Sequence, residues 1–306
     1  MIALRSLAAA VADARSALIR AGVPADEAPG DAEVLARHAL GWDLTQFALR
    51  RHDRVTGDFG HAFAALIGRR AKREPVSQIV GHREFWGLDF EVTRDVLTPR
   101  PETELVVRAT LDVCARRKEL DSWPPIIVDV GTGSGCIAIA LATALPEAMF
   151  IASDASLPAL DVARRNAARH GVSRRIALLH TDVIPPQNNV EIIVSNPPYI
   201  PERERASLPP EVRDYEPPVA LFAGEDGLDF YQLLFDGPGD LTENGALIVE
   251  VGYDQAARVK SLPNPRSWRF ERAYRDLQDI DRVLVFRTVR PADGDDSSMG
   301  RRQHAQ

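Results

Sequence analysis

Asn196-Pro197-Pro198-Tyr199 is the segment of this sequence best suited to hold a planar nitrogen group. The side-chain oxygen of Asn196 and the carbonyl oxygen of Pro197 can each accept one N–H from a substrate –NH₂ group. Because proline fixes φ and has no N–H, the segment presents these oxygens in a rigid frame, and Tyr199 offers a flat face for stacking. The segment therefore predicts a catalytic site made of Asn196, Pro197 and Tyr199, with Pro198 as a further substrate contact.

The chemistry that this segment predicts is group transfer to an amide or amino nitrogen. An amide nitrogen is a poor nucleophile because its lone pair is delocalised into the carbonyl group. Two acceptors that hold its hydrogens would aim the nitrogen and favour the more tetrahedral geometry of the transition state. No general base is evident from the sequence, and none is required, because the newly substituted nitrogen is a strong acid.

A glycine-rich loop, Asp129-Val130-Gly131-Thr132-Gly133-Ser134-Gly135, lies between an apolar run and an alanine-rich stretch that extends to about Ala144. Glycines at such a strand-to-helix turn let a nucleoside approach the backbone closely, without Cβ atoms in the way. About 20 residues further on, Asp154 ends a second apolar run, where a carboxylate can accept hydrogen bonds from both ribose hydroxyls. The loop and the acid together predict a site for a nucleoside cofactor.

Neither motif identifies the cofactor alone. Gly133, Gly135 and Ala138 also satisfy the dinucleotide fingerprint, so the loop by itself does not exclude NAD. Asn-Pro also opens ordinary surface turns, but here it follows an apolar run, residues 192–195, at a place where open α/β sheets bind ligands. Jointly, the two motifs favour a methyltransferase over a dehydrogenase, which would need a pocket for hydride transfer.

The elements that must position these motifs form two groups. The first 73 residues or so read as helices, and residues 84–93 as a β-hairpin. Beyond them, short apolar runs alternate with helical stretches, which is typical of a parallel α/β sheet. The predicted strands contain residues 126–128, 149–152, 176–179, 191–194, 246–251 and 283–286. We expect a helical recognition domain at 1–80, a hairpin linker at 81–98, a catalytic domain at 99–290 and a disordered tail at 291–306.

The composition excludes some functions and agrees with others. A chain of 306 residues with 45% apolar content can form two domains with a sizeable core. Its net charge of −7 argues against a protein that grips nucleic acid through phosphates, so we expect no direct specific nucleic-acid binding. No apolar run is long enough to span a bilayer. The two cysteines, Cys114 and Cys136, lack metal-ligand spacing, so we expect no metal site and a cytoplasmic location.

Several longer motifs show that the chain resembles the release-factor glutamine methyltransferases, the HemK/PrmC family, over nearly its whole length. Those shared with the family are Glu74-Pro75-Val76-Ser77-Gln78-Ile79-Val80-Gly81, Arg83-Glu84-Phe85-Trp86-Gly87, Pro99-Arg100-Pro101-Glu102-Thr103-Glu104, Asp129 through Gly135, Ser195-Asn196-Pro197-Pro198-Tyr199-Ile200, Glu216-Pro217-Pro218 and Gly224-Glu225-Asp226-Gly227-Leu228. The motif at 99–104 and the segment from 216 to 228 are more specific to the family than the glycine loop is. Asn-Pro-Pro-Tyr is also found in adenine-amino DNA methyltransferases.

The resemblance implies a class I S-adenosylmethionine-dependent methyltransferase, with a Rossmann-like seven-stranded sheet and a small N-terminal helical domain. It implies that the loop residues cradle the methionine part of S-adenosylmethionine, that Asp154 holds the ribose and that Asp182 and Val183 border the adenine. Family members often carry an aromatic residue at the Val183 position, and valine stacks less well. Leu97 and Arg100 would line the entrance for cofactor or substrate, although Arg100 could equally be a surface charge. The predicted cofactor site thus contains Leu97, Gly131, Thr132, Gly133, Ser134, Gly135, Asp154, Asp182, Val183 and Asn196, and the substrate site adds Arg100 to the Asn-Pro-Pro-Tyr segment.

The predicted reaction is methylation of the side-chain amide of the glutamine in the Gly-Gly-Gln motif of peptide-chain release factors. One alternative is a glutamine methyltransferase that acts on a ribosomal protein. A second is an adenine-amino nucleic-acid methyltransferase, which would have to flip its base and hold phosphates. A third is an assembly factor that keeps the fold without catalysis, and the intact glycine loop, acid and Asn-Pro-Pro-Tyr segment argue against it.

Overall fold

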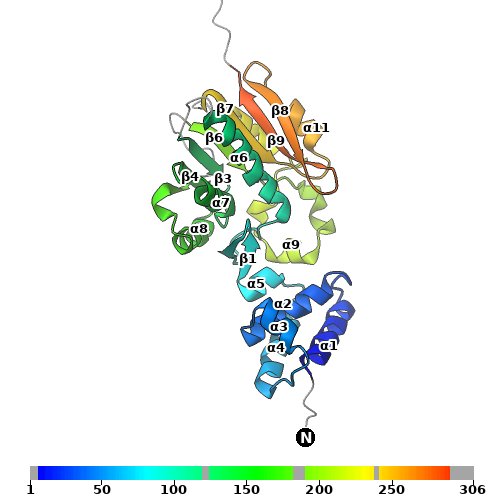
Figure 1. The fold of residues 1–306 in the computed structure, drawn as a ribbon. Helices are drawn as coiled ribbons and strands as arrows, with labels where there is room; N and C mark the ends of the chain where they lie inside the picture. Colours follow the sequence, from blue (N-terminus) through cyan, green and yellow to red (C-terminus); the bar gives the residue numbers. More distant parts are fainter. Residues whose placement is uncertain (1–5, 119–123, 182–189, 238–240, 290–306) are drawn as a thin grey trace, which may run out of the picture.

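The computed structural model describes residues 6–118, 124–181, 190–237 and 241–289. Asp182, Val183 and the predicted tail at 291–306 lie outside these ranges. Figure 1 shows two lobes, a helical lobe near the N-terminus and a larger lobe built on a sheet. No helix in the described part of the chain is both long and apolar enough to span a bilayer.

The helical lobe consists of five helices around its own apolar core. They are α1 (Leu7–Arg20), α2 (Ala28–Leu40), α3 (Leu44–Arg50), α4 (Gly57–Arg70) and α5 (Val76–Val80). Local caps fix several helix starts: the side chains of Ser6, Asp43 and Thr56 each accept a hydrogen bond from a backbone N–H in the first turn. The helices bury apolar side chains from each of them, including Leu18, Leu35 and Phe63.

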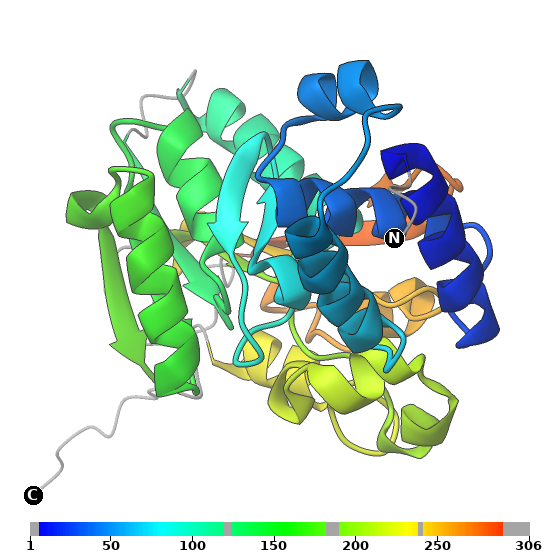
Figure 2. The ribbon, with the colours of Figure 1, turned by 90° about the horizontal axis from the view of Figure 1, so that it is seen from below.

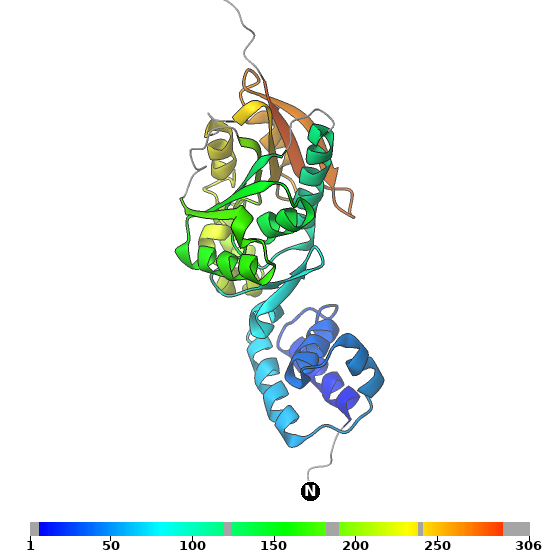
Figure 3. The same cartoon turned by 60° about the vertical axis from the view of Figure 1, so that its left-hand side comes forward.

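A short hairpin connects the two lobes. Its strands are β1 (His82–Phe85) and β2 (Leu88–Glu91), which pair antiparallel. Figure 3 shows α4 leading through α5 into this hairpin, so the connection is continuous and short. Phe85 and Phe90 from the hairpin are buried in the core of the sheet lobe. The hairpin is therefore packed onto the sheet lobe rather than free between the two.

The sheet lobe contains one seven-stranded sheet, in the order β5-β4-β3-β6-β7-β9-β8. Its strands are β3 (Ile126–Val130), β4 (Met149–Asp154), β5 (Ile176–His180), β6 (Val190–Ser195), β7 (Leu241–Glu250), β8 (Trp268–Arg275) and β9 (Asp281–Thr288). The five strands from β5 to β7 pair in parallel, whereas β9 pairs antiparallel to β7 and to β8. The prediction of a parallel α/β sheet is confirmed for the strands from β5 to β7, whereas the predicted strand at 283–286, β9, runs antiparallel. Strand β8 was not predicted, because its residues are largely charged and polar and contain no apolar run.

Helices cover both faces of the sheet. On one face, α6 (Glu104–Lys118) and α7 (Cys136–Ala144) pack on alternate strand residues such as Ile127 and Ile192. On the other face, α10 (Asp229–Asp236) and α11 (Ala256–Ser261) pack on the intervening residues, such as Val128 and Ile193. This alternation is the period of two that a strand buried on both faces requires. Helix α8 (Leu157–Arg169) follows β4, and the side chain of its N-cap residue Ser156 accepts a hydrogen bond from the backbone N–H of Ala159 at 3.2 Å.

Short helical turns complete the lobe. They are η1 (Pro101–Thr103), η2 (Ser173–Arg175), η3 (Glu202–Ser207), α9 (Pro210–Tyr215) and η4 (Pro218–Ala220). Seen from below, η3 and α9 (yellow-green) lie beside the helical lobe (Figure 2). Glu211 on α9 accepts hydrogen bonds from Arg70 and Arg73 of the helical lobe, at 2.7 Å and 2.5 Å. Arg70 is only 2% exposed. Since buried charges are stable only when paired, this contact fixes the segment after Asn-Pro-Pro-Tyr against the helical lobe.

Candidate active site

The two motifs predicted from sequence meet where the strand order of the sheet reverses. The glycine loop follows β3 and the Asn196 segment follows β6, and these strands are neighbours that run in parallel. The chain proceeds from β3 to one side of the sheet and later returns to the other side through β6. In open α/β sheets, ligands bind in the crevice at the carboxyl ends of strands at such a switch point.

The glycine loop adopts a conformation that side chains would oppose. Gly131, Gly133 and Gly135 have φ values of 71°, 55° and 82°, a region that glycine occupies without strain. A Cβ on Gly131 or Gly133 would meet nothing within 4 Å, so the backbone there faces open space. A Cβ on Gly135 would lie 2.8 Å from Ile139 Cδ1. Gly135 therefore allows close packing of α7, while Gly131 and Gly133 leave room for a ligand.

Asp154 holds the loop and faces the same space. One carboxylate oxygen accepts the backbone N–H of Gly133 at 2.8 Å, and the other accepts that of Ser156 at 2.9 Å. Burial raises the pKa of Asp154 above its ordinary value, and these backbone hydrogen bonds counteract part of that effect. Since each carboxylate oxygen can accept more than one hydrogen bond, Asp154 retains acceptor capacity for a ligand.

A cavity of about 90 Å³ lies between these groups. The predicted site residues that line it are Leu97, Gly131, Gly133, Asp154, Asn196 and Pro198. They come from the segment after the hairpin and from the carboxyl ends of β3, β4 and β6. The fold therefore brings an acid, an amide and an open glycine backbone to one cavity, although these residues span 102 positions of the sequence from Leu97 to Pro198.

The other predicted residues lie around this cavity without lining it. Thr132 and Ser134 are buried within the loop, and Thr132 donates a hydrogen bond of 2.6 Å to Asp129. Arg100 forms an ion pair of 2.6 Å with Glu216. The side chain of Tyr199 packs against the core beneath α10 and α11. The roles that we predicted for these residues, and for Pro197, stay predictions.

Sequence analysis missed Phe230, which also lines the cavity. It lies in α10, directly after the motif Gly224-Glu225-Asp226-Gly227-Leu228. The backbone of this motif approaches the site closely, because a Cβ on Gly227 would lie 2.3 Å from the carbonyl oxygen of Tyr199. The motif was therefore a signal that pointed to α10, but only the packing shows which of its side chains faces the cavity.

Asp129, at the end of β3, supports the loop from below. Its Oδ2 accepts hydrogen bonds from the Thr132 hydroxyl and, at 3.2 Å, from the backbone N–H of Ala138. Its Oδ1 has no hydrogen-bond partner among the described residues. Burial raises the pKa of Asp129 from its ordinary value of 3.8 to about 7, although both hydrogen bonds oppose the rise.

The raised pKa of Asp129 predicts a pH-dependent stability. Between pH 3.8 and about 7 the unfolded chain ionises while the folded protein keeps its proton, so the free energy of unfolding falls as pH rises. The side chain in Asp129→Asn cannot ionise. Over this pH range the free energy of unfolding of the variant should therefore fall by less than that of the wild type, by up to roughly 4 kcal/mol. Urea unfolding at a series of pH values measures the difference. Equal pH dependence in the two proteins would contradict the buried, protonated state.

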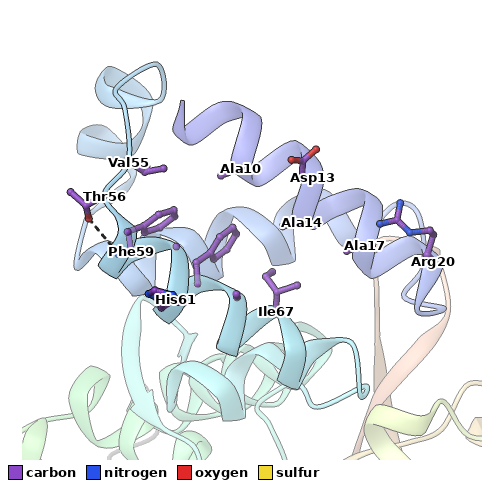
Figure 4. A pocket seen from close by; sticks show the side chains of 14 residues that line it. Ala10, Asp13, Ala14, Ala17, Arg20, Val55, Thr56, Phe59, His61 and Ile67 are labelled. Carbon is purple, nitrogen blue, oxygen red and sulfur yellow. Dashed lines mark hydrogen bonds between the residues drawn. The ribbon is translucent and has the colours of Figure 1, made fainter. Parts of the chain in front are cut away.

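A second cavity, of about 660 Å³, lies within the helical lobe. Figure 4 shows it between α1 and α4, with Ala10, Ala14, Phe59 and Ile67 among its walls. It shares no residue with the cavity at the glycine loop. Within the described residues, no cluster of three or more histidine, cysteine, aspartate and glutamate side chains could hold a metal ion. Gly131, Asp154 and Asn196 all line the other cavity, at the switch point of the sheet.

The open sheet, the glycine loop after β3, the acid at the end of β4 and the Asn-Pro-Pro-Tyr segment after β6 define a class I methyltransferase. Residues 9–81 match the PrmC N-terminal domain and residues 119–208 match the Methyltransferase small domain. The chain belongs to the release factor glutamine methyltransferase family.

Several curated relatives carry that family name. The chain is 40% identical over 259 residues to the release factor glutamine methyltransferase of Agrobacterium fabrum, covering 84% of this chain and 89% of that protein. It is 41% identical to the protein of the same name from Chlorobaculum tepidum, covering 85% and 90%. A bifunctional methyltransferase of Rickettsia typhi is 35% identical, and the match spans 83% of this chain and 52% of that longer protein.

A solved structure supports the fold. The hMettl16 catalytic domain in complex with MAT2A 3'UTR hairpin 6 has a TM-score of 0.52 and 16% identity, covering 72% of this chain and 81% of that one. At this identity the likeness establishes the shared methyltransferase fold alone.

Proposed function

We propose that this enzyme transfers a methyl group from S-adenosylmethionine to the side-chain amide nitrogen of the glutamine in the Gly-Gly-Gln motif of peptide-chain release factors. The names of its relatives support this substrate. The observation that carries the proposal is the position of Asn196, which lines the same cavity as Gly131, Gly133 and Asp154. An acceptor for an –NH₂ group thus lies beside a nucleoside site.

The residues of the cavity fit S-adenosylmethionine, which when bound supplies an activated methyl group. Gly131 and Gly133 offer open backbone to the methionine part, and Asp154 offers acceptors to the ribose hydroxyls. The chain's own contribution at the substrate is to hold the amide nitrogen: Asn196 Oδ1 and the carbonyl oxygen of Pro197 accept its two hydrogens. These acceptors orient the nitrogen lone pair and stabilise the charge that develops as the nitrogen is methylated.

We also propose how a protein substrate reaches this site. A cavity of about 660 Å³ lies between the two lobes, lined by Thr98-Pro99-Arg100-Pro101 and by residues 207–212 of the sheet lobe, together with Arg70 and Arg83. A loop entering here would pass the ion pair of Arg100 and Glu216 on its way to Asn196. On this proposal, residues 1–80 form the recognition domain and residues 99–290 the catalytic domain.

Arg83 tests this path. Its side chain is exposed, lines the cavity between the lobes and has no ion pair or hydrogen bond to the other described residues. A guanidinium at this place can donate hydrogen bonds to the carbonyl groups of an entering loop. Arg83→Glu should raise the KM for release factor about 10-fold, as expected for one lost charged hydrogen bond. The turnover number and the affinity for cofactor should stay within about 2-fold, because Arg83 is remote from the glycine loop cavity.

Arg174→Glu is the matched control, because Arg174 is an exposed arginine in η2 that lines none of these cavities. Steady-state methylation of a purified release factor measures both variants. If the two charge reversals have the same effect on KM, the substrate does not pass Arg83.

The acidic balance of the chain favours a protein substrate over an adenine in nucleic acid. A net charge of −7 gives no general attraction for phosphates. The likeness to an RNA-bound domain, at 16% identity, concerns the fold. We accordingly propose no specific nucleic-acid contact. Cys114 and Cys136 are buried free thiols, which agrees with the reducing cytoplasm that we propose as the compartment.

The deciding experiment combines the purified enzyme, methyl-labelled S-adenosylmethionine and a release factor, either wild type or with the Gly-Gly-Gln glutamine changed to alanine. Label on the wild-type factor alone would establish substrate and residue together. Label on both factors would show that a residue other than this glutamine is methylated. Label on neither, with cofactor binding intact, would refute the release-factor proposal and direct the search to ribosomal proteins.

A further inference from the structure

A short chain of hydrogen bonds ends at the side-chain amide of Asn196. Asn196 Nδ2 donates to Thr103 Oγ1 at 3.0 Å. The Thr103 hydroxyl in turn lies 2.7 Å from Glu250 Oε2 and donates to it. Thr103 and Glu250 are each 2% exposed. Three side chains from η1, from the end of β6 and from the end of β7 therefore meet just behind the proposed acceptor for the substrate.

The single hydrogen of the Thr103 hydroxyl decides which group donates and which accepts in this row of hydrogen bonds. Thr103 has one hydroxyl hydrogen, and the carboxylate of Glu250 is an acceptor that takes it. The hydroxyl oxygen is then left as an acceptor toward Asn196, so it selects the –NH₂ end of the amide. The carbonyl end, Oδ1, is left for the cavity. If the amide were turned over, two acceptors would face each other and the –NH₂ group of Asn196 would meet the hydrogens of the substrate amide.

The surrounding structure holds Thr103 in place from both sides. It ends the turn that contains Pro101, and the backbone N–H of Thr103 donates to the carbonyl oxygen of Arg100 at 3.1 Å. Arg100 is tied to Glu216, and Glu104 accepts the backbone N–H of Trp86 at 2.9 Å. Hydrogen bonds and an ion pair thus connect the motif at 99–104 to the hairpin, to Glu216 and to the ends of β6 and β7.

Glu250 has no compensating cation in direct contact. No ion pair to it is found among the described residues, and its carboxylate contact is with Thr103. Burying such a group costs free energy, and an apolar residue at the end of β7 would pack without that cost. Burial raises the pKa of Glu250 to about 7, and the hydrogen bond from Thr103 opposes that rise. The buried acid is explained by this contact, since the ionised carboxylate is a stronger and more definite hydrogen-bond acceptor for the Thr103 hydroxyl than a neutral group.

We propose that Thr103 and Glu250 are positioning residues, which lock the amide of Asn196 with Oδ1 toward the substrate nitrogen. The inference rests on the proposed function of Asn196 as acceptor. On this proposal the motif at 99–104 contributes to the reaction through Thr103, which orients Asn196 and does not contact the substrate.

Thr103→Val is the decisive variant because valine keeps the shape and removes both the donor and the acceptor. We expect kcat for the release factor to fall about 10-fold or more, since positioning errors at a reacting group have effects of this size. The KM for release factor and the Kd for S-adenosylhomocysteine should stay within about 3-fold. Thr103→Ser keeps the hydroxyl and should retain kcat within about 3-fold of wild type.

Glu250→Gln provides an independent variant should Thr103→Val fail to fold. Its amide can present –NH₂ to Thr103 and release the hydroxyl hydrogen toward Asn196, so kcat should fall by about 5-fold or more with cofactor binding retained. Because Glu250 acts only through Thr103, the double variant should be no slower than Thr103→Val. The proposal is overturned if the losses in kcat of the two single variants multiply in the double variant. It is also overturned if kcat is unchanged in either single variant, or if Thr103→Ser loses as much kcat as Thr103→Val.

The NMR signals of the Asn196 side-chain –NH₂ group give a readout that needs no turnover. Their assignment follows from their absence in Asn196→Ala, and in Thr103→Val they should shift and lose protection from solvent exchange. If the wild-type enzyme fails to label a release factor while these signals respond, the proposed substrate is wrong and the positioning chain stands. Unchanged signals would refute the positioning chain whatever the substrate.

Discussion

Asn196→Ala should lower the turnover number at least about 100-fold, the range seen when one preorganised hydrogen-bonding group is removed from a transition-state site. The expected loss is large because Asn196 Oδ1 is one of two acceptors that hold the reacting nitrogen. Without it the carbonyl oxygen of Pro197 is the remaining acceptor, and a single acceptor does not fix the direction of the nitrogen lone pair. The Kd for S-adenosylmethionine should change by less than about 3-fold, since the loop and Asp154 are untouched.

The measurement is single-turnover transfer of labelled methyl to release factor, with cofactor affinity determined separately by calorimetry. Asn264→Ala is the matched control, because Asn264 is exposed and, among the described residues, its side chain contacts only the backbone N–H of Arg266, from which it accepts a hydrogen bond. Turnover of Asn196→Ala close to that of Asn264→Ala would remove Asn196 from the mechanism. A parallel loss of cofactor binding would instead assign it to the cofactor site.

Asp154→Ala should weaken the binding of S-adenosylmethionine by roughly 100-fold. Two ribose hydroxyls donating to a carboxylate are charged hydrogen bonds, each worth about 1.5–3 kcal/mol, and tenfold in affinity corresponds to about 1.4 kcal/mol. The variant also removes the acceptor for the N–H of Gly133, so the loop loses a support. At saturating cofactor the turnover number should recover most of its value, because the acceptors at the substrate remain in place.

Asp161→Ala is the control for this variant, because Asp161 is an exposed acid of α8 whose one ion pair in the described part of the chain is with the exposed Arg164. Calorimetric titration with S-adenosylhomocysteine compares the two proteins. A cofactor affinity that is the same in both would refute the ribose role of Asp154. Asp154→Asn, which keeps an acceptor and the shape, should fall between wild type and Asp154→Ala.

The sequence by itself determined the local conformations and therefore the class of protein. Three glycines at positive φ specify a loop that other residues would strain, and two consecutive prolines specify a stiff turn. Alternating strands and helices then place both segments at the carboxyl ends of neighbouring strands. These features depend on residues close together in the chain, so reading them required no tertiary structure.

Only the tertiary structure decided which distant side chains meet. Arg100 pairs with Glu216, 116 positions away. Phe230 lines the cavity although its helix follows the Asn-Pro-Pro-Tyr segment by some 30 residues. Thr103 and Glu250 are 147 positions apart and carry no local signal for each other. Hydrogen bonds between buried side chains depend on how whole elements pack, because a shift of a fraction of an ångström makes or breaks them, and a local sequence pattern does not encode that packing.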